Sequence, residues 1–400
     1  MFQDSSLRKQ VLFVLGTLAV FRILSVIPIP GVDQGALAQF LDSNQFFGLL
    51  NIFSGGGLST LSIVMLGVGP YITASIIMQL LTMMSPKLKS MYQEEGAIGR
   101  KRFSQYSRLL SVPLAFAQAF GFIVLLQRQG IVASLDTFAL LTNVLVIVAG
   151  SVFLMWLGEV MTEFGIGNGL SMIIFAGIVA VVPQVASQIF YAFQIEDLFT
   201  YIGLGVLALA MVYLVVFITE AERPIPVTYA KQVRGGKTYG GTSTYLPLRL
   251  NQAGVIPIIF ALSLLLLPQM VLNMLTYLQN PTISQIAVFV NDLMKNQWFY
   301  AAAYFVMVFF FTFFYTAVTF DPKAISDNLQ KGGAFIPGVR PGESTEAYLG
   351  KVVTRITLVG ALFLALVAVL PPVLNAITGI SYLTIGGTGL LIVVSVVLDI

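Results

Sequence analysis

Long apolar stretches recur along the whole sequence, and they constrain the fold of this chain more than any other feature. Of its 400 residues, 57% are hydrophobic and only 10% are charged, and the mean hydropathy is +0.89. Soluble domains carry about 25% charged residues, so this chain lacks the polar side chains that a globular surface needs. The apolar stretches must face lipid or one another, and the sequence predicts an all-α, polytopic membrane protein.

We expect ten membrane-spanning helices, because a bilayer core of about 30 Å needs roughly 20 apolar residues per crossing. The first span lacks a small-residue cleavage site and continues into an ordinary loop, so we interpret it as a retained helix and not as a cleaved signal peptide. The predicted spans are 10–28, 58–84, 106–127, 139–161, 168–189, 201–219, 251–274, 298–319, 352–371 and 382–398.

The positive charges are distributed unevenly between the two sets of loops. Eighteen of the 21 Lys and Arg residues fall on one side, whereas the opposite loops carry only Arg128 and Lys295. The positive-inside rule then places both termini in the cytoplasm, which requires an even number of crossings. The remaining basic residue, Arg22, lies within the first span. We expect it to lie near the cytoplasmic end and to reach the interface or bond to backbone carbonyls; a transport role is the alternative.

Cysteine and histidine are both absent. Disulfides, Cys-ligated metals, Ser-His catalysis and His-based zinc sites are therefore excluded. Acidic residues are nearly absent from the span interiors, whereas ion-coupled carriers normally need buried carboxylates. We expect no enzyme activity, no catalytic residue, no metal site and no cofactor. Passive conduction fits the sequence better than chemistry.

The second predicted span contains an interruption. Gly67-Val68-Gly69-Pro70 lies near its middle, and proline should break the helix there because it removes a backbone donor. Non-helical backbone at membrane depth must be buried in protein or line an aqueous cavity. We therefore predict that 46–66 folds back into the protein. The alternative is a packing kink followed by a flexible external loop, and broken helices also occur in transporters.

Two loops on the basic side, 220–250 and 320–351, are too long to be simple connections. The first begins with an extended-looking stretch and has Arg234-Gly235-Gly236-Lys237 at its centre, which predicts a β-hairpin that reaches away from the membrane. The second is similarly extended, with glycine turns near Gly332 and Gly338. Their positive charge suits docking of a large anionic or acidic partner. The alternative is that the charges only set the topology.

Eight segments together resemble one family, SecY, the central subunit of the bacterial Sec translocon. They run in family order from the first predicted span to the tenth. In this sequence they are IPIPGVD (27–33, preceded by Phe21-Arg22), NIFSGG (51–56), GPYITASIIMQL (69–80), GRKR and SQYSR (99–102 and 104–108), GIGNG (165–169), NQAGVIP (251–257), GGAFIPGVRPG (332–342) and GGTGLLI (386–392).

The resemblance implies an architecture that composition does not show. Residues 1–190 and 200–400 would form two pseudo-symmetric halves, of five helices each, around a central pore. A lateral gate toward lipid would lie between 69–84 and 251–270. A ring of aliphatic side chains would form the waist of the pore, at Val68, Ile72, Leu170, Ile174, Ile259 and Ile392. Taken singly, each of these six fits ordinary core packing equally well.

The same resemblance assigns roles to the segment before the break and to the two long loops. Residues 51–61 would carry the plug, a short helix that fills the external funnel at rest, with Asn51, Phe53, Ser54, Gly55, Gly56 and Gly57 as its marked positions. Arg340 would be the first partner-docking residue, and Arg234, Lys237 and Arg249 weaker ones. One departure concerns the family's usual polar tail after the tenth span, because this sequence ends at Ile400.

The function implied is a protein-conducting channel in the cytoplasmic membrane of a bacterial-type cell. It would pass unfolded secretory polypeptides across the bilayer and release membrane segments laterally. The partners implied are SecE and SecG in the membrane, the motor ATPase SecA, the ribosome, and signal peptides and preproteins. A secondary transporter is the alternative, and an intramembrane protease is a third possibility that the missing histidines argue against.

Overall fold

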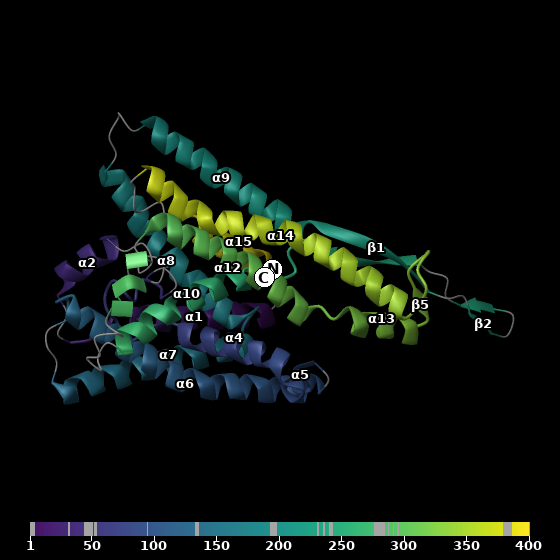
Figure 1. Ribbon diagram of the computed structural model, residues 1–400, viewed down its shortest axis with the longest axis horizontal. Helices are drawn as coiled ribbons and strands as arrows, with labels where there is room; N and C mark the ends of the chain where they lie inside the picture. The colour runs from purple at the N-terminus through teal and green to yellow at the C-terminus, as the bar shows by residue number, and fades with distance from the viewer. Residues whose placement is uncertain are drawn as a thin grey trace.

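Long helices run along the longest axis of the molecule, with α6 and α9 on opposite sides of it in Figure 1. The structure is a computed structural model that describes residues 5–30, 33–43, 51, 54–93, 95–132, 136–192, 198–229, 232–234, 237–239, 243–275, 285–286, 288–290, 292–293, 296–378 and 386–399.

Within these ranges, each of the ten predicted spans contains a helix. Shorter helices α2, α5 and α13 lie between them. The helices are α1 (Ser5–Val26), α2 (Gln34–Ser43), α4 (Gly69–Met84), α5 (Pro86–Gln93), α6 (Gly96–Arg128), α7 (Thr137–Phe164), α8 (Gly169–Ala192), α9 (Leu198–Glu220), α10 (Ile256–Leu275), α12 (Gln297–Thr319), α13 (Pro322–Lys331), α14 (Glu343–Thr378) and α15 (Gly386–Asp399).

The described helices have the composition of membrane spans. Five helical stretches are long and apolar enough to cross a bilayer: Ser5–Val26, Gly96–Arg128, Thr137–Phe164, Gln297–Lys331 and Glu343–Leu374. Their outward side chains, and those of the shorter apolar helices, are themselves apolar. Leu209 on α9 and Leu366 on α14, for example, are 73% and 62% exposed. Such a surface is stable in lipid and not in water, so the chain is a multi-pass membrane protein.

The largest apolar core takes side chains from helices of both predicted halves, including α1, α7, α8, α10, α12, α14 and α15. Helix α12 packs along α14, and α10 packs against α12, α6 and α4. Close packing holds helices together in lipid, because lipid tails are as apolar as the side chains. Glycines bring the backbones together where helices meet. A Cβ at Gly169, for instance, would collide with the carbonyl oxygen of Gly158.

A small β-structure extends beyond the helices at one end of the molecule (Figure 1). Strand β1 (Glu222–Tyr229) pairs antiparallel with β4 (Ser243–Arg249), and β5 (Ala334–Phe335) pairs with the end of β1. Strands β2 (Gln232–Arg234) and β3 (Lys237–Tyr239) form the hairpin tip, with Arg234 opposite Lys237. The predicted β-hairpin is therefore confirmed, and its tip lies where the sequence placed it.

The second long loop, 320–351, is predicted from the sequence to be an extended segment, but much of it is helical. Residues 322–331 form α13, and α14 begins at Glu343, nine residues before the predicted start of that span at 352. Asp321 caps α13 by accepting hydrogen bonds from the backbone N–H groups of Lys323 (3.0 Å) and Ala324 (3.2 Å). Ile325 and Leu329 pack on a core shared by β1, β4, β5 and α14. We call β1–β5, α13, residues 336–342 and the first turns of α14 the strand module.

The interruption of the second span is confirmed. Residues 54–68 form consecutive turns, α4 begins at Gly69, and Pro70 occupies its first turn, where no backbone donor is needed. The turns are held to the chain that leaves α1: the N–H of Ile29 donates to Leu61 O (2.9 Å) and that of Ile63 to Ile27 O (3.0 Å). Residues 54–66 thus fold back into the protein as predicted, whereas 46–50, 52 and 53 lie outside the described residues.

Helix α7 supports these turns through two neighbouring residues. Ser151 donates from its hydroxyl to the carbonyl oxygen of Gly67 (2.8 Å), and Gly150 leaves room for the carbonyl oxygen of Ile63. A Cβ at Gly150 would collide with that oxygen, so only glycine fits without a shift of the backbone. This contact fixes the non-helical segment to the helix beside it.

We predict that Gly150→Ala lowers the free energy of unfolding by about 1–3 kcal/mol, the usual effect of overpacking a rigid contact. The matched control is Gly203→Ala on α9, where a Cβ meets nothing within 4 Å and the better helix propensity of alanine should be neutral or stabilising. Thermal unfolding of both variants in detergent measures the difference. Equal midpoints for the two variants would show that the Gly150 contact is not tight.

Candidate functional site

The six predicted waist residues come from four separate parts of the chain. Val68 directly precedes α4 and Ile72 lies in its first turn, so the break in the second span places both. Leu170 and Ile174 are four residues apart on α8 and therefore share one face of it. Ile259 lies in the first turn of α10 and Ile392 in the middle of α15.

All six side chains belong to the main apolar core, which takes side chains from helices of both predicted halves. Val68, Ile174 and Ile392 are buried, each at most 3% exposed. Ile72, Leu170 and Ile259 are partly buried and pack against the same core. The six therefore lie in the interior of the helical bundle and not on its outer surface, as a constriction requires.

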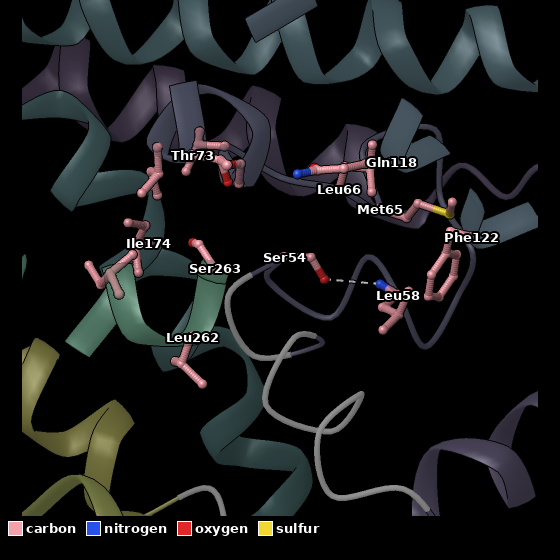
Figure 2. Close-up of a pocket in the computed structure, with 14 residues that line it drawn as sticks. Ser54, Leu58, Met65, Leu66, Thr73, Gln118, Phe122, Ile174, Leu262 and Ser263 are labelled. Atoms are coloured by element: carbon pink, nitrogen blue, oxygen red, sulfur yellow. Dashed lines mark hydrogen bonds between the residues drawn. The ribbon is translucent and has the colours of Figure 1, made fainter. Parts of the chain in front are cut away.

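A cavity of about 60 Å³ lies between this cluster and the turns of 54–68. Val68, Ile72, Ile174 and Ile259 line it, whereas Leu170 and Ile392 do not. Figure 2 shows Ile174, Leu262 and Ser263 on one side of the cavity and Leu58, Met65 and Phe122 on the other, with Ser54 between them. The polar groups in the lining are few, among them the side chains of Thr73, Gln118 and Ser263.

The segment next to the cavity is compact and bonded to itself. The side chain of Asn51 accepts from Ser59 N (2.7 Å), and the Ser54 hydroxyl accepts from Leu58 N (3.1 Å) and donates to Asn51 O (3.0 Å). Gly55 and Gly56 have φ of 70° and 81°, which glycine adopts at no steric cost.

The structure differs from the predicted plug in one respect. The described residues 54–61 are turns, so the expectation of a short helix is wrong for that part of the segment, because internal hydrogen bonds and left-handed glycines replace the helical pattern. Phe53 lies outside the described residues. Asn51, Ser54, Gly55, Gly56 and Gly57 all belong to the bonded segment, and Gly57 N donates to Ser54 O (3.3 Å).

The two predicted gate helices, α4 and α10, lie against each other, and α6 packs on both. Helix α10 begins at Ile256, so the predicted gate residues 251–255 form a non-helical lead-in with Gly254 at φ 59°. The chain just before this lead-in packs closely on α14. A Cβ built on Gly360 of α14 would lie 2.7 Å from Leu250 O, so glycine is needed there for the close approach. The chain that leads into the predicted gate helix α10 therefore passes close to α14.

Arg340 stands exposed on a tight turn of the strand module. Gly338 and Gly342, at φ of 82° and 94°, flank it. Two buried hydroxyls hold the turn from separate helices: Thr345 on α14 donates to Arg340 O (2.9 Å), and Ser326 on α13 donates to Gly342 O (2.8 Å). The backbone that carries the arginine is thus fixed while its side chain is free to reach outward.

The weaker docking candidates lie in the same module. Arg234 and Lys237 face each other across the hairpin tip. Arg249 lies 3.5 Å from Glu222 on the neighbouring strand, which offsets part of its charge. The sequence did not predict that β5 of the second loop would pair with β1 of the first, because pairing between distant segments leaves no local signal.

The arrangement offers little for chemistry. In the described part of the chain, no three His, Cys, Asp or Glu side chains lie close enough together to hold a metal ion. Glu159 forms an ion pair with Arg108, at 2.5 Å between Oε1 and Nε. An acid that is paired in this way does not resemble the open carboxylate of an ion-coupled carrier.

Comparisons with known proteins agree with this geometry. The model of the SecY family matches residues 62–400. The protein translocase subunit SecY of Pseudomonas aeruginosa is 43% identical over 399 residues, which cover 99% of this chain and 89% of that protein.

Two solved structures have a similar fold. One, a study of the SecY plug domain and its role in the closed channel, matches with a TM-score of 0.66 and 21% identity, covering 99% of this chain and 91% of that one. The other, Sec61 in a canine ribosome–channel complex, matches with a TM-score of 0.62 and 19% identity over the same shares of both chains.

Proposed function

Because the chain belongs to the SecY family, we propose that its six clustered aliphatic side chains form the waist of a protein-conducting pore. The protein is a channel and not an enzyme. It passes unfolded secretory polypeptides across the membrane and releases membrane segments laterally into it. The observation that carries the assignment of the waist is that four of the six, from three segments distant in sequence, line one cavity, while all six belong to the main apolar core.

The physical basis of the seal is the absence of hydrogen-bonding groups at the constriction. A narrow ring of aliphatic side chains dewets, so ions that would have to shed their hydration shell do not pass. The same side chains can move aside for an extended polypeptide, and they do not require that polypeptide to have a particular sequence. The segment 51–61 acts as a plug that covers the waist at rest, and its burial against the cavity supports this role.

The contact between α4 and α10 is the lateral gate in its closed position. Residues 1–190 and 200–400 are the two halves that move apart when the gate opens. The main core takes side chains from both halves, which supports a seam that opens by separating packed apolar surfaces.

The protein lies in a bacterial-type cytoplasmic membrane, with both chain termini on the cytoplasmic side. On that same side, the strand module is the docking surface for partners. Its fixed turn with an exposed Arg340 supports recognition of an acidic protein surface or of RNA phosphates, which arginine binds through two hydrogen bonds. The expected partners at the strand module are SecA and the ribosome, and the expected partners within the membrane are SecE and SecG. The secondary-transporter alternative gains no support from the paired Glu159.

Replacing Ile72 and Ile259 together with serine should raise ion leak through the resting channel by roughly tenfold or more, because each hydroxyl lowers the cost of hydrating the constriction. Ion flux from liposomes that contain the purified protein measures this. Leu209→Ser, on the lipid-facing side of α9, is the control and should not leak. A leak in the double variant no larger than that of the control would remove these two residues from the waist.

Arg340→Glu should reduce motor-dependent export by roughly tenfold, because it replaces a docking cation with a charge that repels an acidic partner. Translocation of a secretory protein into inverted membrane vesicles, with purified SecA, gives the rate. Lys351→Glu makes the same change of charge on an exposed position of α14 and should have a smaller effect. Equal losses in both variants would indicate a general effect of charge rather than a specific docking residue.

Thr345→Val should weaken the same export while Arg340 itself stays in place, because the carbonyl oxygen of Arg340 loses its donor and the turn loosens. Thr345→Ser keeps the hydroxyl and should restore the rate. Thermal stability in detergent, measured beside export, separates loosening of the turn from loss of the fold. Failure of the serine variant to restore export would show that the hydroxyl does not position Arg340.

A further inference from the structure

Arg22 has a specific partner within the protein. Its guanidinium Nη1 donates to the carbonyl oxygen of Gly55 at 2.7 Å. Arg22 lies six residues from the nearer end of its predicted span, whereas Arg108 and Arg355 lie within the first four residues of theirs. A charged side chain in a membrane helix is costly unless it finds acceptors, so such residues commonly serve a function. The expectation that Arg22 bonds to a backbone carbonyl is confirmed, and the carbonyl belongs to the proposed plug.

Gly55 fits into a slot that excludes any larger residue. Its φ is 70°, and a Cβ built on it would lie 2.6 Å from Cζ of Phe21 and 3.1 Å from Cα of Gly177. Phe21 precedes Arg22 on α1 and is 1% exposed, while Gly177 lies on α8. The backbone of the plug is therefore seated between two helices at the point where Arg22 binds it.

A second attachment lies one helical turn further along α1. The hydroxyl of Thr60 donates to the carbonyl oxygen of Ser25 at 2.8 Å. Thr60 is next to the backbone bridge between 27–29 and 61–63, so this end of the segment is fixed in several ways. Gly55 lies five residues farther from that bridge, and the bond to Arg22 joins this more distant part of the segment to α1.

From these contacts we infer that Arg22 is a positioning residue that latches the plug in its seat. The inference rests on the proposed function of 51–61 as the plug. One charge-assisted hydrogen bond is strong enough to hold the seated state and weak enough to be exchanged. A polypeptide that enters the pore brings backbone carbonyls, the same kind of acceptor as Gly55, and these can take over the guanidinium when the plug leaves.

The test compares Arg22→Met, which removes the donor, with Arg22→Lys, which keeps a positive donor. Each is reconstituted in liposomes, and ion leak of the resting channel is measured. A second readout is labelling of a single cysteine at Ser59 by a membrane-impermeant maleimide, which is clean because the chain has no other cysteine. Arg22→Met should raise both leak and labelling roughly 10- to 100-fold, the range of a hydrogen bond to a charged group. Arg22→Lys should lie between it and the parent.

Two controls make the outcome decisive. Arg128→Met removes an arginine outside the segment and should change neither readout. Gly55→Val unseats the plug by collision and should raise both. If the Gly55→Val channel leaks ions and the Arg22→Met channel does not, Arg22 does not hold the plug, although 51–61 still acts as one. If neither leaks although Ser59 becomes labelled, the plug does not seal the pore and the inference fails with it. If the Arg22→Met variant does not fold, Arg22→Gln, which also removes the positive charge, is measured in its place and should raise leak and labelling in the same direction.

Discussion

At membrane depth, every backbone donor and acceptor needs a partner within the protein, and the arrangement of this channel follows from that constraint. The chain breaks its helical pattern at 54–68, in the middle of an apolar span, and satisfies the exposed backbone through its neighbours. The exit of α1 bonds to Leu61 and Ile63, Ser151 of α7 bonds to Gly67, and Gly150 makes room for Ile63 O. Once the break is stabilised, α4 begins beside the cavity and brings Val68 and Ile72, two of the proposed waist residues, to its lining.

Outside the membrane helices, a second small core gives the proposed docking surface its rigidity. The two long loops are far apart in sequence, yet β1 pairs with strands from both of them, and their apolar side chains share one core with the start of α14. Because α14 packs along α12 and α12 packs against α10, the module that carries Arg340 is connected through packed helices to one of the two proposed gate helices. A partner bound at the module therefore meets a continuous body rather than two flexible loops.

The spans, the break at Gly67–Pro70 and the hairpin tip at Arg234–Lys237 could all be predicted from the sequence, because hydropathy, proline and glycine act locally. Helix α13 escaped prediction, since its few apolar residues, such as Ile325 and Leu329, are too sparse to raise the hydropathy. The pairing of β5 with β1 and the bond from Arg22 to Gly55 are contacts between distant segments, which local patterns do not encode. The six waist residues depended on the family resemblance, because each alone is indistinguishable from core packing.

The most direct measurement of the central claim is cross-linking of a chain caught in transit. The protein has no cysteine, so one can be placed at each waist position in turn and paired with a cysteine in a secretory polypeptide that is stalled by a folded domain. The account predicts that the waist cysteines, such as those at Ile72 and Ile259, form disulfides with the stalled chain, and that cysteines at the lipid-facing Leu209 and Leu366 do not. Cross-linking at the waist that is no stronger than at these two outward positions would contradict it.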